Sequence, residues 1–392
     1  MGNAKVIEVY KEVDEKIYQL SKVFPEPEIF LEPANENLMK KLFFEGKIND
    51  VEFKYQPHYF DVNKYLKLVK NVDVPEGMLK ELYEERKKEI ILHLLMIKYR
   101  GNAEKMRELS SELYGVVDLF IFNKALAVAK GILGSSEQEK NEGDGETIKG
   151  SELINLFNTL IKRFGLEKRG WKAIATGKKL VSVSPVEKLI RINPNREFTI
   201  KYAKRLVVHE FFVHTFRGEN GHMQPLKIFL KFPKYLETEE GLAVYFERNT
   251  GYGDDLKFAE YAGRVIAVRL AYEGKSFKYI FDYLLDLGFE KETAWNLCFR
   301  VFRGGCFLKD FVYFKGYLDL ERHRFEKDLK VQYLYCGKVG LKNIDLVKDL
   351  ISEKIIKKPQ ILPPNLKELR DLSGVKKFVE DFFRDYMSTS ST

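Results

Sequence analysis

The stretch from Thr199 to Arg217 constrains the fold of this 392-residue chain more than any other. Its second half is apolar on nearly every side when it is drawn as a helix, and a helix of that kind is buried. Three ionisable residues nevertheless lie inside it, namely His209, Glu210 and His214. Burying such groups without partners costs free energy. The sequence therefore predicts a buried helix that is built around a compensating group.

A metal ion is the compensating group that these residue types indicate. Neutral imidazoles coordinate Zn²⁺, and a catalytic zinc site has three protein ligands and one open position for water. Zinc lowers the pKa of bound water to about 7, so that a nearby carboxylate can complete its deprotonation. Glu210 directly follows His209, as the glutamate does in an HExxH site. On spacing alone, two unrelated histidines in a core remain an equal alternative.

The spacing of the two histidines is HExxxH, with one residue more than in HExxH. In a regular α-helix, residues five apart differ in direction by about 140°, so that His209 and His214 would diverge. A π-type bulge, which has more residues per turn, returns such a pair to one face. We therefore expect the helix to widen between Glu210 and His214.

The best candidate for a third ligand is Glu240, in the segment Thr238–Ala243. It shares a helix face with Glu247, so we expect Glu240 to point inward and Glu239 to stay at the surface. A pair of glutamates in the first turn also complements the helix dipole without any metal. His222 is the competing third ligand, and it lies beyond an expected turn over residues 218–221.

The rest of the chain predicts a mainly helical α+β fold. Helical spacing in residues 8–22, 76–98, 102–114 and 116–133 predicts a helical N-terminal region, residues 1–133. The polar, Gly- and Glu-rich segment 134–150 is expected to be a linker. Residues 151–337 are the predicted metal-binding domain, and residues 338–392 a C-terminal helical extension. Within the metal-binding domain, a small antiparallel sheet is expected ahead of the His209 helix, with strands at residues 171–175, 180–184 and 188–192.

Composition and charge exclude several classes of protein. The net charge of +8 is spread through helical stretches, whereas nucleic-acid binders usually concentrate it. No run of about 18 apolar residues predicts a membrane span, and residues 1–14 lack a signal-peptide core. The three cysteines match no metal-binding pattern, and their odd number is typical of a reducing compartment. We therefore expect a cytoplasmic protein with three buried thiols, and neither nucleic acid nor membrane as a partner.

Four segments, in order along the chain, resemble the microtubule-associated tyrosine carboxypeptidase family. They are HEFFVHTFRGENG (residues 209–221), TEEGLA (238–243), GCFLKDFVYFKG (305–316) and, more weakly, RGNAEKMRELSSELYG (100–115). The likeness is to the prokaryotic branch, whose second motif is similar to QEGLP. This chain has EEGLA at that position.

The resemblance implies one zinc ion per chain in a zincin-like catalytic domain, with His209, His214 and Glu240 as ligands and Glu210 as the general base. Eukaryotic members of the family remove the C-terminal tyrosine of α-tubulin. We therefore expect a zinc metallopeptidase that acts as a carboxypeptidase on protein or peptide C-termini, with aromatic residues among the candidates. The alternative is a zinc-containing binding or regulatory protein without turnover.

Carboxypeptidase chemistry also needs a cation for the terminal carboxylate of the substrate and a donor for the oxyanion. Arg217, close to His214 on the same helix, is the first candidate for a bidentate carboxylate clamp. Lys309 and Tyr313 are four residues apart, which places them on one helix face as further candidates for these contacts. The alternatives are that Arg217 complements the helix dipole and that Tyr313 belongs to the core. An extended substrate is expected to pair with the strand at residues 180–184 or 188–192.

Overall fold

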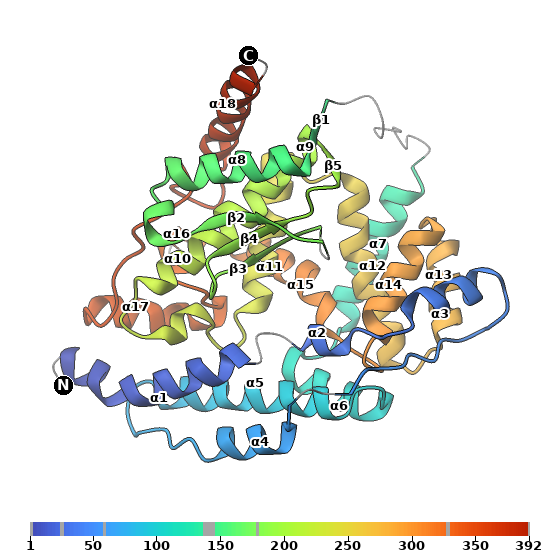
Figure 1. The fold of residues 1–392 in the computed structure, drawn as a ribbon, viewed down its shortest axis with the longest axis horizontal. Helices are drawn as coiled ribbons and strands as arrows, with labels where there is room; N and C mark the ends of the chain where they lie inside the picture. The colour runs from blue at the N-terminus through green and yellow to red at the C-terminus, as the bar shows by residue number, and fades with distance from the viewer. Residues whose placement is uncertain are drawn as a thin grey trace. The chain divides into compact units, whose positions relative to one another are not determined.

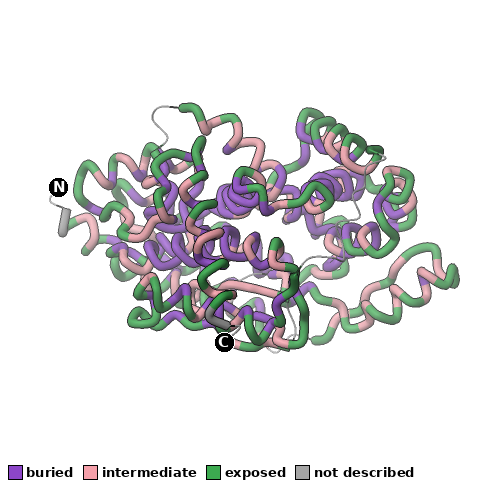
Figure 2. The backbone as a smooth tube through the Cα atoms, turned by 90° about the horizontal axis from the view of Figure 1, so that it is seen from above, coloured by how far each residue is buried: buried purple, intermediate pink, exposed green. Residues whose placement is uncertain are grey.

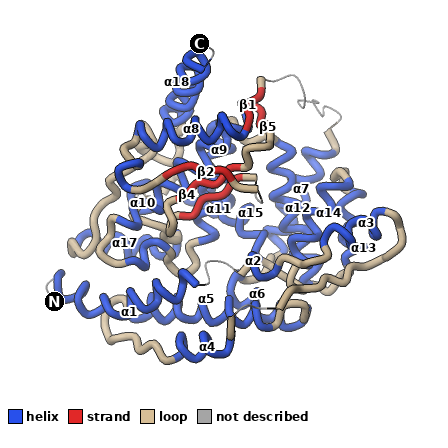
Figure 3. The backbone as a smooth tube through the Cα atoms, viewed as in Figure 1, coloured by secondary structure: helices blue, strands red, loops and turns tan. Residues whose placement is uncertain are grey.

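The computed structural model describes residues 3–23, 27–57, 60–135, 146–177, 180–326 and 330–390, and it divides into two compact units. Unit 1 comprises Met1–Ile7, Glu139–Asp254 and Gly316–Thr392, and unit 2 comprises Glu8–Gln138 and Asp255–Lys315. Both units are mainly helical, and the strands are few and short (Figures 1 and 3). This confirms the predicted mainly helical α+β fold with a helical N-terminal region.

All the regular secondary structure in the described residues of unit 2 is helical. The four helices predicted before residue 134 are confirmed as α1 (Asn3–Val23, from residue 8 in this unit), α5 (Lys80–Lys98), α6 (Ala103–Tyr114) and α7 (Leu119–Leu133). The others are α2 (Glu28–Leu31), α3 (Glu36–Phe44), α4 (Val62–Lys70), α12 (Asp255–Tyr272), α13 (Phe277–Asp286), α14 (Lys291–Phe302) and η4 (Lys309–Phe311). Of the expected linker, residues 136–145 lie outside the described part of the chain.

Unit 1 contains two small sheets. Strands β1 (Thr147–Lys149) and β5 (Glu197–Thr199) form an antiparallel pair that the sequence did not predict. The three predicted strands are confirmed as β2 (Lys172–Ala175), β3 (Val181–Ser184) and β4 (Leu189–Ile192), in the order β2-β4-β3. The hairpin of β3 and β4 is antiparallel as expected, whereas β2 runs parallel to β4. Because β2 lies beside β4 and not beside its neighbour in sequence, the sheet is mixed.

Helices of unit 1 enclose one apolar core. Figure 2 colours the buried residues of the chain purple. Helix α8 (Gly150–Arg163) packs on β2 and β4, and α11 (Leu236–Thr250) packs on the segment that holds the two histidines. Phe211, Phe212 and Phe216 of that segment meet Phe164 and Phe378. The remaining elements are η1 (Glu167–Arg169), η3 (Lys227–Leu230), α15 (Val312–His323, from residue 316 in this unit), α16 (Val331–Leu334), η5 (Leu341–Asn343), α17 (Ile344–Ser352) and α18 (Ser373–Ser390).

The histidine-bearing helix runs through three consecutive elements. Helix α9 (Ile200–Leu206) begins after Thr199, whose hydroxyl accepts a hydrogen bond from the Tyr202 amide at 3.2 Å. It continues as the π-helix η2 (Val207–Thr215) and then as α10 (Phe216–His222). The predicted widening is therefore confirmed.

The turn expected at residues 218–221 is wrong, because those residues are helical. The two glycines there allow close packing: a Cβ on Gly218 would lie 2.7 Å from the Pro185 side chain, and one on Gly221 would lie 2.6 Å from the Phe229 carbonyl oxygen.

The structure also describes the three cysteines and the apolar character of the helices. Cys298, Cys306 and Cys336 are free and buried, which agrees with their interpretation as small core residues. No helix in the described ranges has both the length and the apolar character needed to cross a bilayer.

Candidate metal centre

The π-helix brings His209 and His214 onto one face of η2. Their ring centroids lie 4.8 Å apart, although the residues are five positions apart in sequence. The Thr215 hydroxyl donates to the Glu210 carbonyl oxygen at 2.8 Å, and these two residues are likewise five positions apart. π-bulges are rare, and they occur frequently at functional sites. In this chain the widened turn has a direct geometric result, because it aligns two imidazoles that a regular helix would separate.

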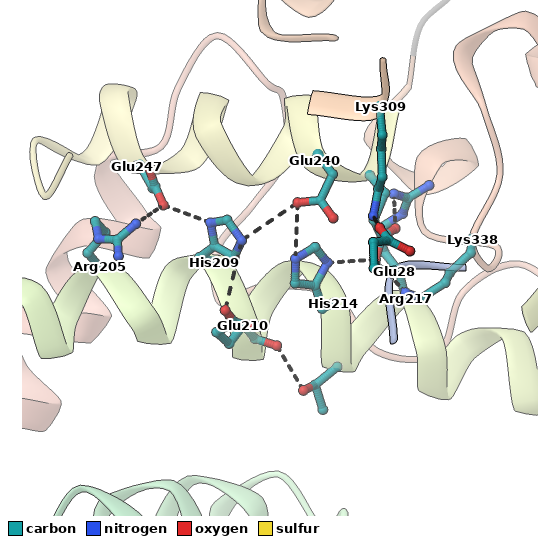
Figure 4. Close-up of polar contacts among 12 residues, drawn as sticks. Glu28, Arg205, His209, Glu210, His214, Arg217, Glu240, Glu247, Lys309 and Lys338 are labelled. Carbon is teal, nitrogen blue, oxygen red and sulfur yellow. Dashed lines mark hydrogen bonds and ion pairs between the residues drawn. The ribbon is translucent and has the colours of Figure 1, made fainter. Parts of the chain in front are cut away.

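Glu240 of α11 completes a group of three possible ligands (Figure 4). Its Oε2 lies 3.9 Å from His209 Nε2 and 3.8 Å from His214 Nε2. All three ligand atoms lie within 4.8 Å of one another, so the group could hold a metal ion. The predicted competitor, His222, has its Nε2 2.8 Å from the Pro185 carbonyl oxygen and is not part of this group.

The dimensions of the group suit a small divalent cation. Zn–N distances of about 2.0–2.1 Å and Zn–O distances of about 2.0–2.2 Å place tetrahedral donors about 3.3–3.5 Å apart. The two separations from Glu240, 3.8 and 3.9 Å, are slightly larger than this, and the three donors all lie within 4.8 Å of one another, so the side chains would have to close around the ion to coordinate it. The donor set of two imidazoles and one carboxylate is typical of catalytic zinc sites.

Each imidazole has a buried carboxylate on its other nitrogen. His209 Nδ1 lies 2.7 Å from Glu247 Oε1, and His214 Nδ1 lies 2.7 Å from Glu239 Oε1. An ionised carboxylate only accepts hydrogen bonds, so each Nδ1 must carry the proton. A neutral imidazole that is protonated on Nδ1 has its free lone pair on Nε2, the atom that faces Glu240.

The electrostatic balance differs between the two sides of the group. Burial disfavours the charged form of His209, but the carboxylates of Glu210, Glu247 and Glu240 outweigh this effect and raise its pKa above the ordinary value. Burial would likewise raise the pKa of the Glu239 carboxyl, but Arg217, Lys338 and His214 outweigh it and hold that pKa well below its usual range. The site therefore concentrates negative charge around His209, as a cation site requires.

Glu210 lies next to the three possible ligands. Its Oε1 is 4.0 Å from His209 Nε2, on a different side of the imidazole from Glu240 in Figure 4. The side chains of Glu210 and Glu240 are each 13% exposed, whereas those of Glu239 and Glu247 are 1% exposed. Glu210 and Glu240 are therefore the two carboxylates of the cluster that solvent can reach.

Two glycines allow α15 to approach α11 beside Glu240. A Cβ on Gly316 would lie 1.9 Å from the Glu237 carbonyl oxygen, and one on Gly241 would lie 2.3 Å from the Gly316 carbonyl carbon. Both obstacles are backbone, which cannot rotate out of the way as a side chain can. A larger residue at either position would push apart the helices that fix Glu240 against η2.

The expectation that Glu239 stays at the surface is wrong. Glu239 is 1% exposed and contacts three basic side chains: it pairs with Arg217, its Oε1 lies 2.9 Å from Lys338 Nζ, and the same Oε1 faces His214. These cations offset the desolvation that would otherwise keep a carboxylate out of the interior. Glu239 and Glu247 thus contact the histidines although the sequence interpretation assigned neither to the site.

The burial and the existing partners of Arg217 disfavour the predicted contact between its side chain and a substrate. The residue is 0% exposed. Its Nε donates to the Leu334 carbonyl oxygen at 2.8 Å, its Nη2 donates to the Val339 carbonyl oxygen, and its Nη1 pairs with Glu239. Every nitrogen of the guanidinium group already has a partner inside unit 1.

Lys309 and Tyr313 belong to unit 2. Lys309 forms an ion pair with Glu28. The Tyr313 ring stacks on Tyr261 with centroids 5.5 Å apart, and the Arg264 guanidinium lies 4.5 Å from the Tyr313 ring centroid. Their contribution to a substrate site stays a prediction.

Comparison with known proteins identifies the family. The family model described as microtubule-associated tyrosine carboxypeptidase matches residues 41–384. The mouse (Mus musculus) protein "Putative tyrosine carboxypeptidase MATCAP2" is 27% identical over 202 residues, which cover 47% of this chain. Its human (Homo sapiens) counterpart is 27% identical over 183 residues, or 43% of this chain. These matches span only 37% and 34% of the two relatives' own lengths. Because the family model matches most of the chain and includes both histidines and Glu240, this protein belongs to the microtubule-associated tyrosine carboxypeptidase family.

Proposed function

We propose that the protein is a zinc-dependent carboxypeptidase that removes one residue, with aromatic residues among the candidates, from the C-terminus of a peptide or protein. The proposal rests above all on one observation: His209 Nε2, His214 Nε2 and Glu240 Oε2 converge beside Glu210. A purely structural zinc site usually has four protein ligands and needs no adjacent base. The presence of Glu210 therefore favours an enzyme over a zinc-containing binding protein.

In this proposal Glu210 acts as the general base and then as the general acid. A zinc ion in the site would polarise the scissile carbonyl and lower the pKa of water. The Glu210 carboxylate accepts a proton from the attacking water and then delivers it to the leaving amine. Its partial exposure suits this role, since the carboxylate must reach both water and substrate.

Strand β3 is the proposed platform for the substrate backbone. Of the two strands expected to bind the peptide, β4 is central in its sheet and β3 lies at an edge. The Asn193 amide donates to the Leu180 carbonyl at 3.0 Å, and alternate residues of an antiparallel strand face its partner. Val181 and Val183 therefore direct their N–H and C=O groups to the free edge. Because β3 packs against η2, a peptide added there would run beside the metal group.

We assign Arg217 to supporting Glu239 and not to binding the terminal carboxylate, because its side chain is fully buried and partnered. The selectivity for a C-terminus then depends on another cation, for which Lys309 remains the proposed residue. Tyr313 remains the proposed donor to the oxyanion.

Arg217→Ala distinguishes the two roles. We expect it to lower the free energy of unfolding by about 3–5 kcal/mol, because the buried carboxylate of Glu239 would lose one of the cations that neutralise it. Two substrates of one sequence are compared, one with a free C-terminal carboxylate and one with that carboxyl as a neutral ester. If Arg217 only supports Glu239, cleavage of both should fall by the same factor. The measurement is kcat/KM on both substrates, with urea unfolding of the variant. A loss confined to the free-acid peptide would restore Arg217 as the carboxylate clamp.

The proposed activity itself is tested with the purified, zinc-loaded protein and a library of free-acid peptides, analysed by mass spectrometry. The carboxypeptidase proposal predicts products that are one residue shorter at the C-terminus. Zinc binding without any shortened product would favour the binding or regulatory protein.

A further inference from the structure

We propose that Glu239 and Glu247 are positioning residues of the metal centre, each holding one imidazole ligand through its Nδ1 atom. Buried cations in turn hold each carboxylate, and part of this support comes from the segment Leu334–Val339. The inference rests on the proposed metal site and extends it to residues that do not contact the metal.

On the His209 side, support comes from within the two helices that face each other. Glu247 Oε1 lies 2.7 Å from His209 Nδ1 and 2.6 Å from Arg205 Nη1. Arg205 is 5% exposed and Glu247 is 1% exposed. The line Arg205–Glu247–His209 therefore joins α9, α11 and η2 through charged groups that are almost wholly removed from solvent (Figure 4).

On the His214 side, support comes from farther along the chain. Glu239 Oε1 accepts from both His214 Nδ1 and Lys338 Nζ, and Arg217 pairs with the other oxygen of the carboxylate. Arg217 also donates to the carbonyl oxygens of Leu334 and Val339. The segment Leu334–Val339 thus holds the carboxylate that orients His214, although it crosses the boundary predicted at residue 337 between the metal-binding domain and the C-terminal extension.

Stability alone does not account for these charged groups. Apolar residues of similar size are often as stable as a buried ion pair, or more so, because the ions pay a desolvation penalty. A carboxylate on the outer nitrogen of a metal-binding histidine fixes its tautomer and ring orientation, and its loss typically weakens metal binding about 10- to 100-fold. The same arrangement on both histidines points to support of the metal and not to packing.

The test is zinc affinity, measured by chelator competition on Glu247→Ala, Glu239→Ala and Glu239→Gln. We expect the two alanine variants to bind zinc about 10- to 100-fold more weakly than the wild type. Glu239→Gln keeps an amide oxygen that can accept from His214 Nδ1, so its affinity should lie between those of the wild type and Glu239→Ala. Lys338→Met removes a cation that contacts Glu239 and no histidine ligand, so it should show a smaller loss in the same direction.

Glu219→Gln is the matched control. Glu219 is a buried carboxylate of the same unit, 2% exposed, with Lys188 at 2.9 Å and the Trp171 indole N–H at 2.7 Å, and it contacts neither of the histidine ligands. We expect it to lower the Tm of the zinc-free protein while leaving zinc affinity unchanged.

The inference is overturned if the Glu239 and Glu247 variants bind zinc as tightly as the wild type, or if Glu219→Gln weakens binding equally. Should the alanine variants fail to fold, Glu239→Gln and Glu247→Gln, each compared with Glu219→Gln, decide the question for the two histidines. Failure of the proposed metal site is a separate result, since the wild-type protein would then bind no zinc at all.

Discussion

Glu210→Gln is expected to lower peptide hydrolysis about 100-fold or more, the usual scale of general acid–base catalysis, with one zinc ion per chain retained. Glutamine has nearly the same shape as glutamate but cannot accept the proton of water. Because Glu210 is not among the three grouped ligands, its loss should spare metal binding. The measurement is kcat/KM on a free-acid peptide together with elemental analysis of the same preparation.

Two results would contradict the role of Glu210. Undiminished cleavage with full zinc would remove it from the mechanism. Loss of both zinc and activity would mean that Glu210 helps to bind the metal, as Glu240 is expected to do, and is not only a general base. The zinc content therefore has to be measured on the same sample as the rate.

His209→Ala, His214→Ala and Glu240→Ala are each expected to abolish stoichiometric zinc binding and, with it, peptide cleavage. The physical reason is that each replacement removes one of three donors that converge within 4.8 Å. Elemental analysis after dialysis against a weak chelator measures the metal, and circular dichroism shows whether the fold survives.

His222→Ala is the matched control, because His222 lies on α10 of the same unit but outside the ligand group. It should retain full zinc content. A Glu240→Ala protein with full zinc would remove Glu240 from the ligand set and leave His222 or Glu239 as the third ligand. A folded but zinc-free His222→Ala protein would favour His222.

The main features of the site could be predicted from the sequence because they depend on local geometry. Two histidines five residues apart do not share one face of a regular α-helix, so a shared metal required a widened turn, and η2 provides it. The apolar character of the rest of that segment predicted its burial, and its phenylalanines form part of the core. The position of Glu240 on the inward face of α11 followed from its spacing relative to Glu247.

Features that depend on distant segments could not be predicted in this way. Glu239 was expected at the surface because Glu240 shares a helix face with Glu247, whereas the structure buries it with Lys338 from a later segment. Arg217 was expected to bind the substrate because it lies close to His214 on the same helix, and its contacts with the carbonyl oxygens of Leu334 and Val339 come from an equally remote segment. The parallel pairing of β2 with β4 also depends on contacts between separate segments, and the residue pattern within each strand does not specify it. The predicted domain boundaries stay a prediction.

The most direct test of the account is a titration of metal-free protein with zinc, followed by the rate at which the C-terminal residue is released from a free-acid peptide. If His209, His214 and Glu240 form the single catalytic site, the rate should rise from near zero and level off at one equivalent of zinc per chain. Cleavage that proceeds equally well in the metal-free protein would contradict the account, as would a protein that binds its equivalent of zinc and releases no residue.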